Sequence, residues 1–213
     1  MSEIIDFKKM QKELYQPKLV PSVVEVPPMK FFMIDGVGNP NTSAAYQSAI
    51  ATLYGLSYAI KMSKKGDCVP KGYFDYVVPP LESLWHSVSG GLIEDLADKD
   101  NFAWTAMLRQ PDFVNESVFE WAKEIIHKKK SELDLSKVCF ETLDEGLCLQ
   151  ILHIGSYDNE PEATAKMDEF LANSEYQADF SQNRRHHEIY LSDPRKTAPE
   201  KLKTVIRIPI KKA

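Results

Sequence analysis

The chain of 213 residues carries 26 Lys and Arg against 31 Asp and Glu, and this net charge of −5 disfavours a protein that binds phosphate backbones, so no nucleic-acid partner is expected. Its content of 43% hydrophobic and 27% charged residues is typical of a soluble globular protein and excludes disorder and fibrous repeats. No apolar run approaches the roughly 18 residues of a membrane span, and the first residues lack the apolar core of a signal peptide. We therefore expect a cytosolic chain with no membrane partner.

The first half begins with an arm at residues 1–21, which we expect to pack on the fold because Phe7, Leu14 and Tyr15 would be costly to expose together. Residues 23–37 are rich in β-branched and aromatic types and predict the first strand. A glycine turn then leads into a helix of about twenty residues with one apolar stripe. The strands expected next are 73–78, 81–86 and 102–109, with a proline pair between the first two.

A connecting helix is predicted over residues 115–131, with Asn115 as its cap. The pattern of the first half then starts again. The second half is expected to contain strands at 138–143 and 147–154, a helix from Pro161, and strands at 186–191 and 203–210. Each half therefore has the order strand, glycine turn, helix, strand, strand. This order predicts one domain with a repeated βαββ unit, its halves spanning about 22–110 and 136–213.

Two glutamates on matching strands are the first candidates for chemistry. Alternate side chains of a strand point to opposite faces, so Glu188 and Tyr190 share one face while Ile189 and Leu191 cover the helix on the other. Glu82 occupies the matching place in the first half. If both glutamates face a common cleft, desolvation raises their pKa and they form an acid–base pair. Otherwise Glu188 is a surface residue and Glu82 caps a loop.

Aromatic side chains near these strands are candidates for a ligand-binding surface. The set comprises Trp85, Trp104, Tyr76, Tyr157 and Tyr190, with His153 as a further candidate. Flat apolar rings with polar edges suit a planar, lipophilic ligand. Core packing is the alternative for each of these residues.

Metal and cofactor chemistry has weaker support in the sequence. A Gly-x-Gly pair after the first strand lacks the third glycine of a dinucleotide motif and is better explained as a turn. His186 and His187 point to opposite sides of a strand, so a metal site would need one of them with His153 and Glu188. The three cysteines are odd in number and lack a C-x-x-C pair, which indicates free thiols. We expect no cofactor and no metal.

Several longer strings then make a resemblance visible. They are FMIDGVGNP at 32–40, PLESLW at 80–85, QPDFV at 110–114, LHIGSY at 152–157, HHEIYLSDP at 186–194 and KTVIR at 203–207. In these strings the chain resembles the GyrI-like small-molecule-binding proteins, and it is most similar to a stand-alone branch described as cyclopropanoid cyclohydrolases. The resemblance implies an α+β fold of duplicated βαββ (SHS2) modules in a pseudo-two-fold arrangement, with a central ligand cleft.

The resemblance also implies an activity, the hydrolysis of a strained cyclopropane in lipophilic DNA-alkylating natural products, which detoxifies them. It assigns the family's cleft glutamate to Glu188 and a second acidic position to Glu82. Ser83 and His86 depart from the family's pattern at positions that bear on ligand preference. On this interpretation the carboxylates hold a water that attacks the ring, while Tyr190 gives a proton to the conjugated carbonyl.

A binding module for lipophilic, often cationic compounds is the main alternative, because an aromatic box with a carboxylate attracts cations without altering them. A gyrase-directed inhibitor is a further alternative, although the sequence has no acidic tail or exposed apolar stripe for it. A transcription regulator is less favoured, because the segment before residue 22 is too short for a helix-turn-helix. The expected partner is therefore a lipophilic planar small molecule, and a protein partner stays open.

Overall fold

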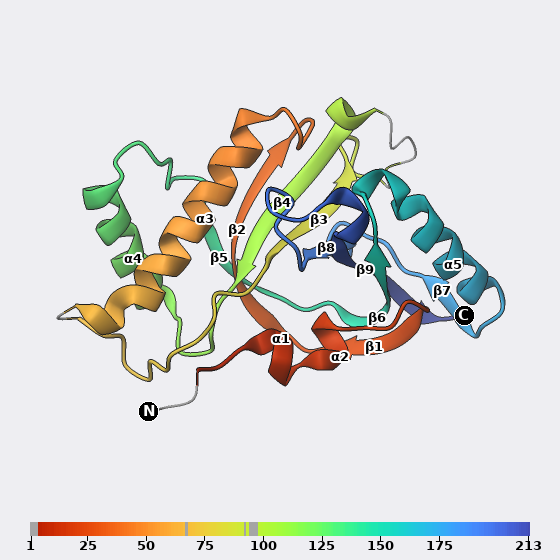
Figure 1. The fold of residues 1–213 in the computed structure, drawn as a ribbon, viewed down its shortest axis with the longest axis horizontal. Helices are drawn as coiled ribbons and strands as arrows, with labels where there is room; N and C mark the ends of the chain where they lie inside the picture. The colour runs from red at the N-terminus through yellow and green to blue at the C-terminus, as the bar shows by residue number, and fades with distance from the viewer. Residues whose placement is uncertain (1–3, 67, 92, 94–97) are drawn as a thin grey trace.

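The computed structural model describes residues 4–66, 68–91, 93 and 98–213 (Figure 1). Its strands are β1 (Ser22–Val26), β2 (Met29–Val37), β3 (Leu81–Ser87), β4 (Phe102–Arg109), β5 (Cys139–Leu143), β6 (Gly146–Ile154), β7 (Tyr176–Ala178), β8 (His186–Tyr190) and β9 (Lys203–Lys212). Its α-helices are α1 (Phe7–Met10), α2 (Lys12–Tyr15), α3 (Ala44–Met62), α4 (Glu116–Lys129) and α5 (Glu160–Ala172). Short 3-10 turns are η1 (Ser63–Lys65), η2 (Lys99–Asn101), η3 (Tyr157–Asn159) and η4 (Pro199–Lys201).

The strands form one curled antiparallel sheet in the order β1-β6-β9-β8-β3-β4-β2-β5, with β7 added beside β9. Helix α3 packs on β2 and β4, and α4 packs on α3, whereas α5 packs on β6 at the other end of the sheet. Figure 1 shows α3 and α5 on either side of the central strands, and α1 and α2 below the sheet. The α+β class predicted from the sequence is therefore confirmed.

Both halves of the chain pair their strands in the same way. The strand before the helix pairs with the last strand of its half, which pairs with the middle strand, giving β2-β4-β3 and β6-β9-β8. The two middle strands, β3 and β8, then pair with each other at the centre. Each half also takes an outer strand from the other, since β1 pairs with β6 and β5 pairs with β2. A duplication with boundaries at 22–110 and 136–213 stays a prediction.

Two of the expected strands differ in the structure, and prolines explain the first difference. The stretch 23–37 is divided at Pro27 and Pro28 into β1 and β2, which pair at opposite ends of the sheet. Proline has no N–H for a ladder, so it interrupts a strand. The stretch 73–78 is no strand: Tyr76 makes one isolated bridge to Ile5, and its buried ring packs among Tyr73, Phe74 and Phe113.

The core lies on both faces of the sheet. One cluster fills the space under α3 and α4, and a second lies under α5. A third cluster lies on the opposite face, where Leu14 and Tyr15 of α2 pack on Leu84, Met107 and Val205 of the sheet. Because residues alternate between faces along a strand, every central strand contributes to both layers.

Helix α3 carries one wall of the site, and its start and its packing are fixed locally. Ser43 caps the helix by accepting a hydrogen bond from the Tyr46 backbone N–H. The Tyr46 ring then meets Trp104 of β4 edge to face, with 4.8 Å between ring centroids. Trp104 can lie there because Gly36 stands opposite it on β2, and a Cβ at Gly36 would come within 2.2 Å of the indole. This glycine therefore sets the position of Tyr46.

Candidate functional site

A groove lies on the helical face of the sheet between α3 and α5, and the central strands β3 and β8 form its floor. The whole hollow has a volume of about 2620 Å³, above the roughly 300–1,000 Å³ of typical small-molecule pockets, because it is open to solvent and continues past α3 to residues of α4. The residues that line its central part are Tyr46, Trp85, Phe102, Tyr157, Glu160, His186, Glu188 and Tyr190. Both halves of the chain contribute to this set.

Glu188 lies at the centre of the groove floor, with 13% of its side chain exposed. Its Oε2 accepts a hydrogen bond of 2.8 Å from the Tyr190 hydroxyl, and its Oε1 lies 3.2 Å from His186 Nε2. These residues stand two apart on β8, so strand alternation brings all three to one face. The expectation that Glu188 and Tyr190 share a face agrees with this geometry. Ile189 points to the other face, where it packs in the cluster with Leu14 rather than under α5.

Aromatic rings surround this carboxylate. Trp85 Nε1 donates a hydrogen bond of 3.0 Å to the Tyr190 hydroxyl, so indole, phenol and Glu188 form one chain of hydrogen bonds. Tyr157 meets the Tyr190 ring edge to face, with 5.8 Å between centroids. Tyr46 closes the α3 side, where its hydroxyl lies 2.9 Å from Ser83 Oγ. The arrangement is an aromatic box around a carboxylate, which suits flat or cationic ligands.

A second carboxyl group reaches the same place from α5. Glu160 is the first residue of that helix, and its buried Oε1 has no hydrogen-bond partner among the described residues. Burial, and then the nearby charge and hydrogen bonding of Glu188, raise the pKa of Glu160 well above its usual range. Burial and the charge of Glu188 thus favour the neutral form of this carboxyl group.

The phenols of the box are also held in their neutral form. Burial, followed by the repulsion of Glu188, raises the pKa of Tyr190 well above its usual value. The same two causes raise the pKa of Tyr157 to about 12. Burial raises the pKa of Tyr46 to about 12 as well. These hydroxyls thus keep their protons near neutral pH, and that of Tyr190 donates its proton to Glu188.

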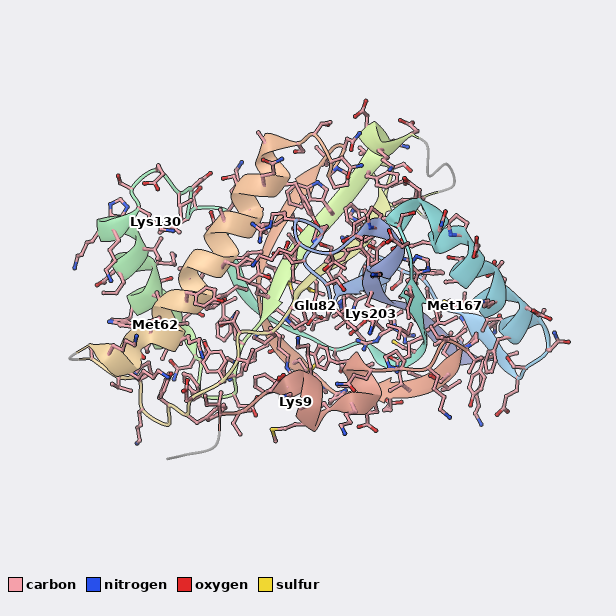
Figure 2. The ribbon with its side chains drawn as sticks, viewed as in Figure 1. Lys9, Met62, Glu82, Lys130, Met167 and Lys203 are labelled. Atoms are coloured by element: carbon pink, nitrogen blue, oxygen red, sulfur yellow. The ribbon has the colours of Figure 1, made fainter. Side chains whose placement is uncertain are left out.

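The expectation that Glu82 and Glu188 face one cleft is wrong. Ser83 is the residue paired with Glu188 across β3 and β8, so Glu82, one position earlier, points to the opposite face. It is fully buried near the centre of the molecule, on the face of the sheet that α2 covers (Figure 2). Tyr15 of α2 donates a hydrogen bond of 3.4 Å to Glu82 Oε1. Glu82 therefore has no access to a ligand in the groove.

Glu82 instead belongs to a buried charged network on the far face of the sheet. His187 Nε2 lies 2.9 Å from Glu82 Oε2 as an ion pair without hydrogen-bond geometry, and His187 Nδ1 lies 2.9 Å from Glu145 Oε1. Arg207 Nη1 donates a 2.9 Å hydrogen bond to Glu145 Oε2, and Nη2 donates one of 3.0 Å to the backbone carbonyl of Leu14. The network thereby fastens the N-terminal arm to the sheet.

The pKa values of this network follow from its pairing. Burial disfavours the charged form of His187, but Glu145 and Glu82 outweigh it and raise the pKa of this histidine to about 9. Burial also favours the neutral form of Glu145, but His187 and Arg207 outweigh it and lower the pKa of that carboxyl group to about 2. Both groups are therefore charged at neutral pH, and each compensates the other.

Three further sequence candidates lie outside the groove. Trp104 is buried behind Tyr46, so it supports the box without lining it. Tyr76 is buried in the aromatic cluster beyond α3, where its hydroxyl donates a 3.4 Å hydrogen bond to the Ser57 carbonyl. His153 Nε2 lies 2.9 Å from the backbone carbonyl oxygen of Ser156, near the start of α5. Trp85, Tyr157, Glu188 and Tyr190 are the candidates that the structure brings together.

Sequence reasoning missed Tyr46, Glu160 and His186. The first two lie in the opening turns of α3 and α5, and both helices pack with those turns toward the central strands. A signal was present, because each half places a helix start directly after its glycine turn. The sequence suggests His186 only as a possible metal ligand. Within the described part of the chain, no group of three or more His, Cys, Asp or Glu side chains could hold a metal ion, so the alternative metal site at His153 and Glu188 is not supported.

Comparisons with known proteins agree with the fold and the groove. Residues 20–211 match the family described as GyrI-like small molecule binding domain, and the chain belongs to this GyrI-like family. No helix of the described residues has the length and apolar character needed to cross a membrane.

Three solved structures are similar to this chain over nearly its whole length. Two structures described as a hydrolase from Listeria innocua are 45% and 46% identical, with TM-scores of 0.89 and 0.91; they cover 97% and 98% of this chain and all of their own chains. An uncharacterized conserved protein from Listeria innocua is 48% identical with a TM-score of 0.92, over 97% of this chain and 100% of its own. No curated protein matches the chain.

Proposed function

We propose that this protein binds a lipophilic, planar small molecule in the groove and hydrolyses it, with a strained cyclopropane fused to a conjugated carbonyl as the reacting unit. The observation that carries the proposal is Glu188, a carboxylate at the floor of an aromatic groove with hydrogen bonds that fix its orientation. The hydrolase description of two similar structures supports a hydrolytic reaction. Hydrolysis of an alkylating compound of this kind would remove its reactivity.

The proposed reaction uses Glu188 as the general base. A water beside its carboxylate gives a proton to Glu188 and attacks the least hindered cyclopropane carbon. The ring C–C bond breaks, and the electron pair moves into the conjugated carbonyl to give an aromatic phenolate, which takes up a proton to become the phenol. Tyr190 and His186 orient the carboxylate, while Trp85 and Tyr157 hold the ligand plane. General-base assistance contributes about a hundred- to ten-thousand-fold, and release of ring strain supplies the remaining driving force.

A non-catalytic binding module is the second candidate, and one observation favours it. Both oxygens of Glu188 already have partners, Tyr190 and His186, as expected of a group that holds a cationic ligand by charge. Aromatic faces around such a carboxylate attract cations without chemistry. In that case the ligand leaves the groove unchanged.

The deciding experiment follows a probe that carries a cyclopropane fused to a conjugated cyclohexadienone. Mass spectrometry after incubation with the protein should show addition of one water, and oxygen-18 water should label the product. In Glu188→Gln the rate should fall about a hundred-fold or more, while quenching of tryptophan fluorescence by the probe persists. Glu175→Gln, at an exposed position paired with Lys212, is the matched control. A probe recovered unchanged from the wild-type protein would favour binding alone.

A further inference from the structure

Two carboxyl groups from different elements line the groove and interact with each other. Glu188 comes from the middle of β8 and Glu160 from the first turn of α5. Glu188 has two hydrogen-bonding partners on its own strand, whereas Glu160 Oε1 is buried and no donor reaches it among the described residues. Glu188, itself an acceptor, is the neighbour that interacts with Glu160. An unpartnered buried carboxyl oxygen is costly unless a ligand or a proton satisfies it. The two carboxyl groups therefore have different surroundings.

The groups that face Glu160 explain which member of the pair keeps a proton. They are Glu188 and Tyr190 on β8, Tyr157 and Asp158 on η3, and Lys99 on η2. His186 on β8 and Tyr46 on α3 line the same groove. Lys99 is the fixed cation of this set, and it is engaged in an ion pair of 3.0 Å with Asp158. Burial and the charge of Glu188 therefore dominate, and both favour the neutral form of Glu160.

Tyr190, the proton donor expected from the sequence, is a poor acid in this structure. Its hydroxyl proton is already donated to Glu188 Oε2. Burial and the repulsion of Glu188 also raise the pKa of this phenol far above neutral pH. A neutral carboxyl group gives up its proton far more readily than such a phenol. Where neighbouring titratable groups are driven apart in pKa, their roles as acid and base separate accordingly.

Building on the proposed hydrolysis, we propose that Glu160 is the general acid of the groove and Glu188 its general base. As the ring C–C bond breaks, Glu160 gives its proton to the carbonyl oxygen of the ligand, which becomes the phenol oxygen. The attacking water forms the new C–O bond and gives one proton to Glu188. That proton then passes from Glu188 to the adjacent Glu160, which restores both groups. The net change is the addition of one water to the ligand.

The test compares Glu160→Gln with Glu162→Gln, an exposed glutamate in the same first turn of α5. With the cyclohexadienone probe, kcat of Glu160→Gln should fall about a hundred-fold. The Kd for a non-reactive planar analogue, read from tryptophan fluorescence, should change less than about threefold, which is no more than the effect of losing one hydrogen bond. Probes that give a more acidic phenol need less help from an acid, so the loss should shrink along such a series. Glu160→Asp should recover part of the rate.

A second measurement follows the proton itself. Infrared difference spectra at neutral pH should contain the carbonyl stretch of a protonated carboxyl group in the wild-type protein and in Glu162→Gln, and lose it in Glu160→Gln. A missing band in the wild-type protein, or an unchanged kcat in Glu160→Gln, overturns the assignment of Glu160 while the hydrolytic function stands. No turnover by the wild-type protein, with the band present, instead overturns the hydrolytic function itself and with it the acid role.

Discussion

Glu188 is paired with Ser83 across the two central strands, and this register sends Glu82 to the opposite face of the sheet. The two glutamates therefore serve different purposes. Glu188 is partly exposed in the groove, whereas Glu82 is sealed beneath the N-terminal arm next to His187. Substitutions at the two positions should consequently separate chemistry from stability.

Glu82→Gln is expected to weaken the fold and leave the groove intact. Removing one partner of a buried ion pair typically costs about 3–5 kcal/mol, because the remaining charge loses its compensation. Urea unfolding should show that loss, and thermal unfolding should show a fall in Tm of about 2–4 °C for each kcal/mol in a domain of this size. Glu120→Gln, at a half-exposed glutamate paired with Lys123 on α4, should stay near the wild type. Unchanged unfolding with abolished probe turnover would contradict this assignment.

The stability of the protein should depend on pH through His187 and Glu145. The pKa of His187 is raised from about 6.5 to about 9, so its contribution is complete below pH 6.5 and is lost as pH rises through 9. The pKa of Glu145 is lowered from 4.5 to about 2, so its contribution is complete above pH 4.5 and is lost as pH falls toward 2. The free energy of unfolding, measured by urea titration, should therefore be greatest between about pH 4.5 and 6.5.

His187→Gln provides the control for this profile. The variant lacks the imidazolium, so the decline between pH 6.5 and 9 should disappear, although the protein is less stable throughout. The acid limb should remain, because Arg207 still pairs with Glu145. A wild-type profile that rises from pH 6.5 to 9 would show that His187 is not protonated in the folded protein.

Gly36→Ala should displace Trp104 and, through it, the Tyr46 wall of the groove. The added Cβ would come within 2.2 Å of the Trp104 indole, which in turn touches Tyr46. Overpacking of this kind costs about 1–3 kcal/mol, and the near-UV circular dichroism of the tryptophans should change. Gly55→Ala is the matched control in α3, where the nearest side-chain atom stands 3.5 Å away and alanine favours a helix by roughly 0.5–1 kcal/mol. Equal stability of the two variants would contradict the close contact at Gly36.

Local patterns in the sequence were sufficient to predict most helices and the strand face on which Glu188 lies. Asn115 caps α4 as expected, since its side chain accepts a hydrogen bond from the Val118 N–H. Glu188 and Tyr190 stand two residues apart on one strand, so their common face needs no knowledge of the rest of the fold. Properties that depend on neighbours within a few residues were thus predictable.

Properties that depend on distant pairing were not predictable in the same way. The relation of Glu82 to Glu188 is decided by the register of β3 against β8, and a shift of one residue reverses every side chain. The same holds for Trp104, which sits on a strand but faces a helix that covers it. Glu160 joins the site through the packing of α5 on β6, which no spacing within the α5 sequence reveals.

The exchange of outer strands makes the two halves of the chain depend on each other for a complete sheet. β1 completes the sheet beside β6, and β5 completes it beside β2, so each half is closed by a strand encoded in the other. A chain nicked between α4 and β5 would yield two fragments that each leave a sheet edge bare when alone. Such fragments should stay together and keep a working groove, so the two halves behave as obligate partners held in one polypeptide.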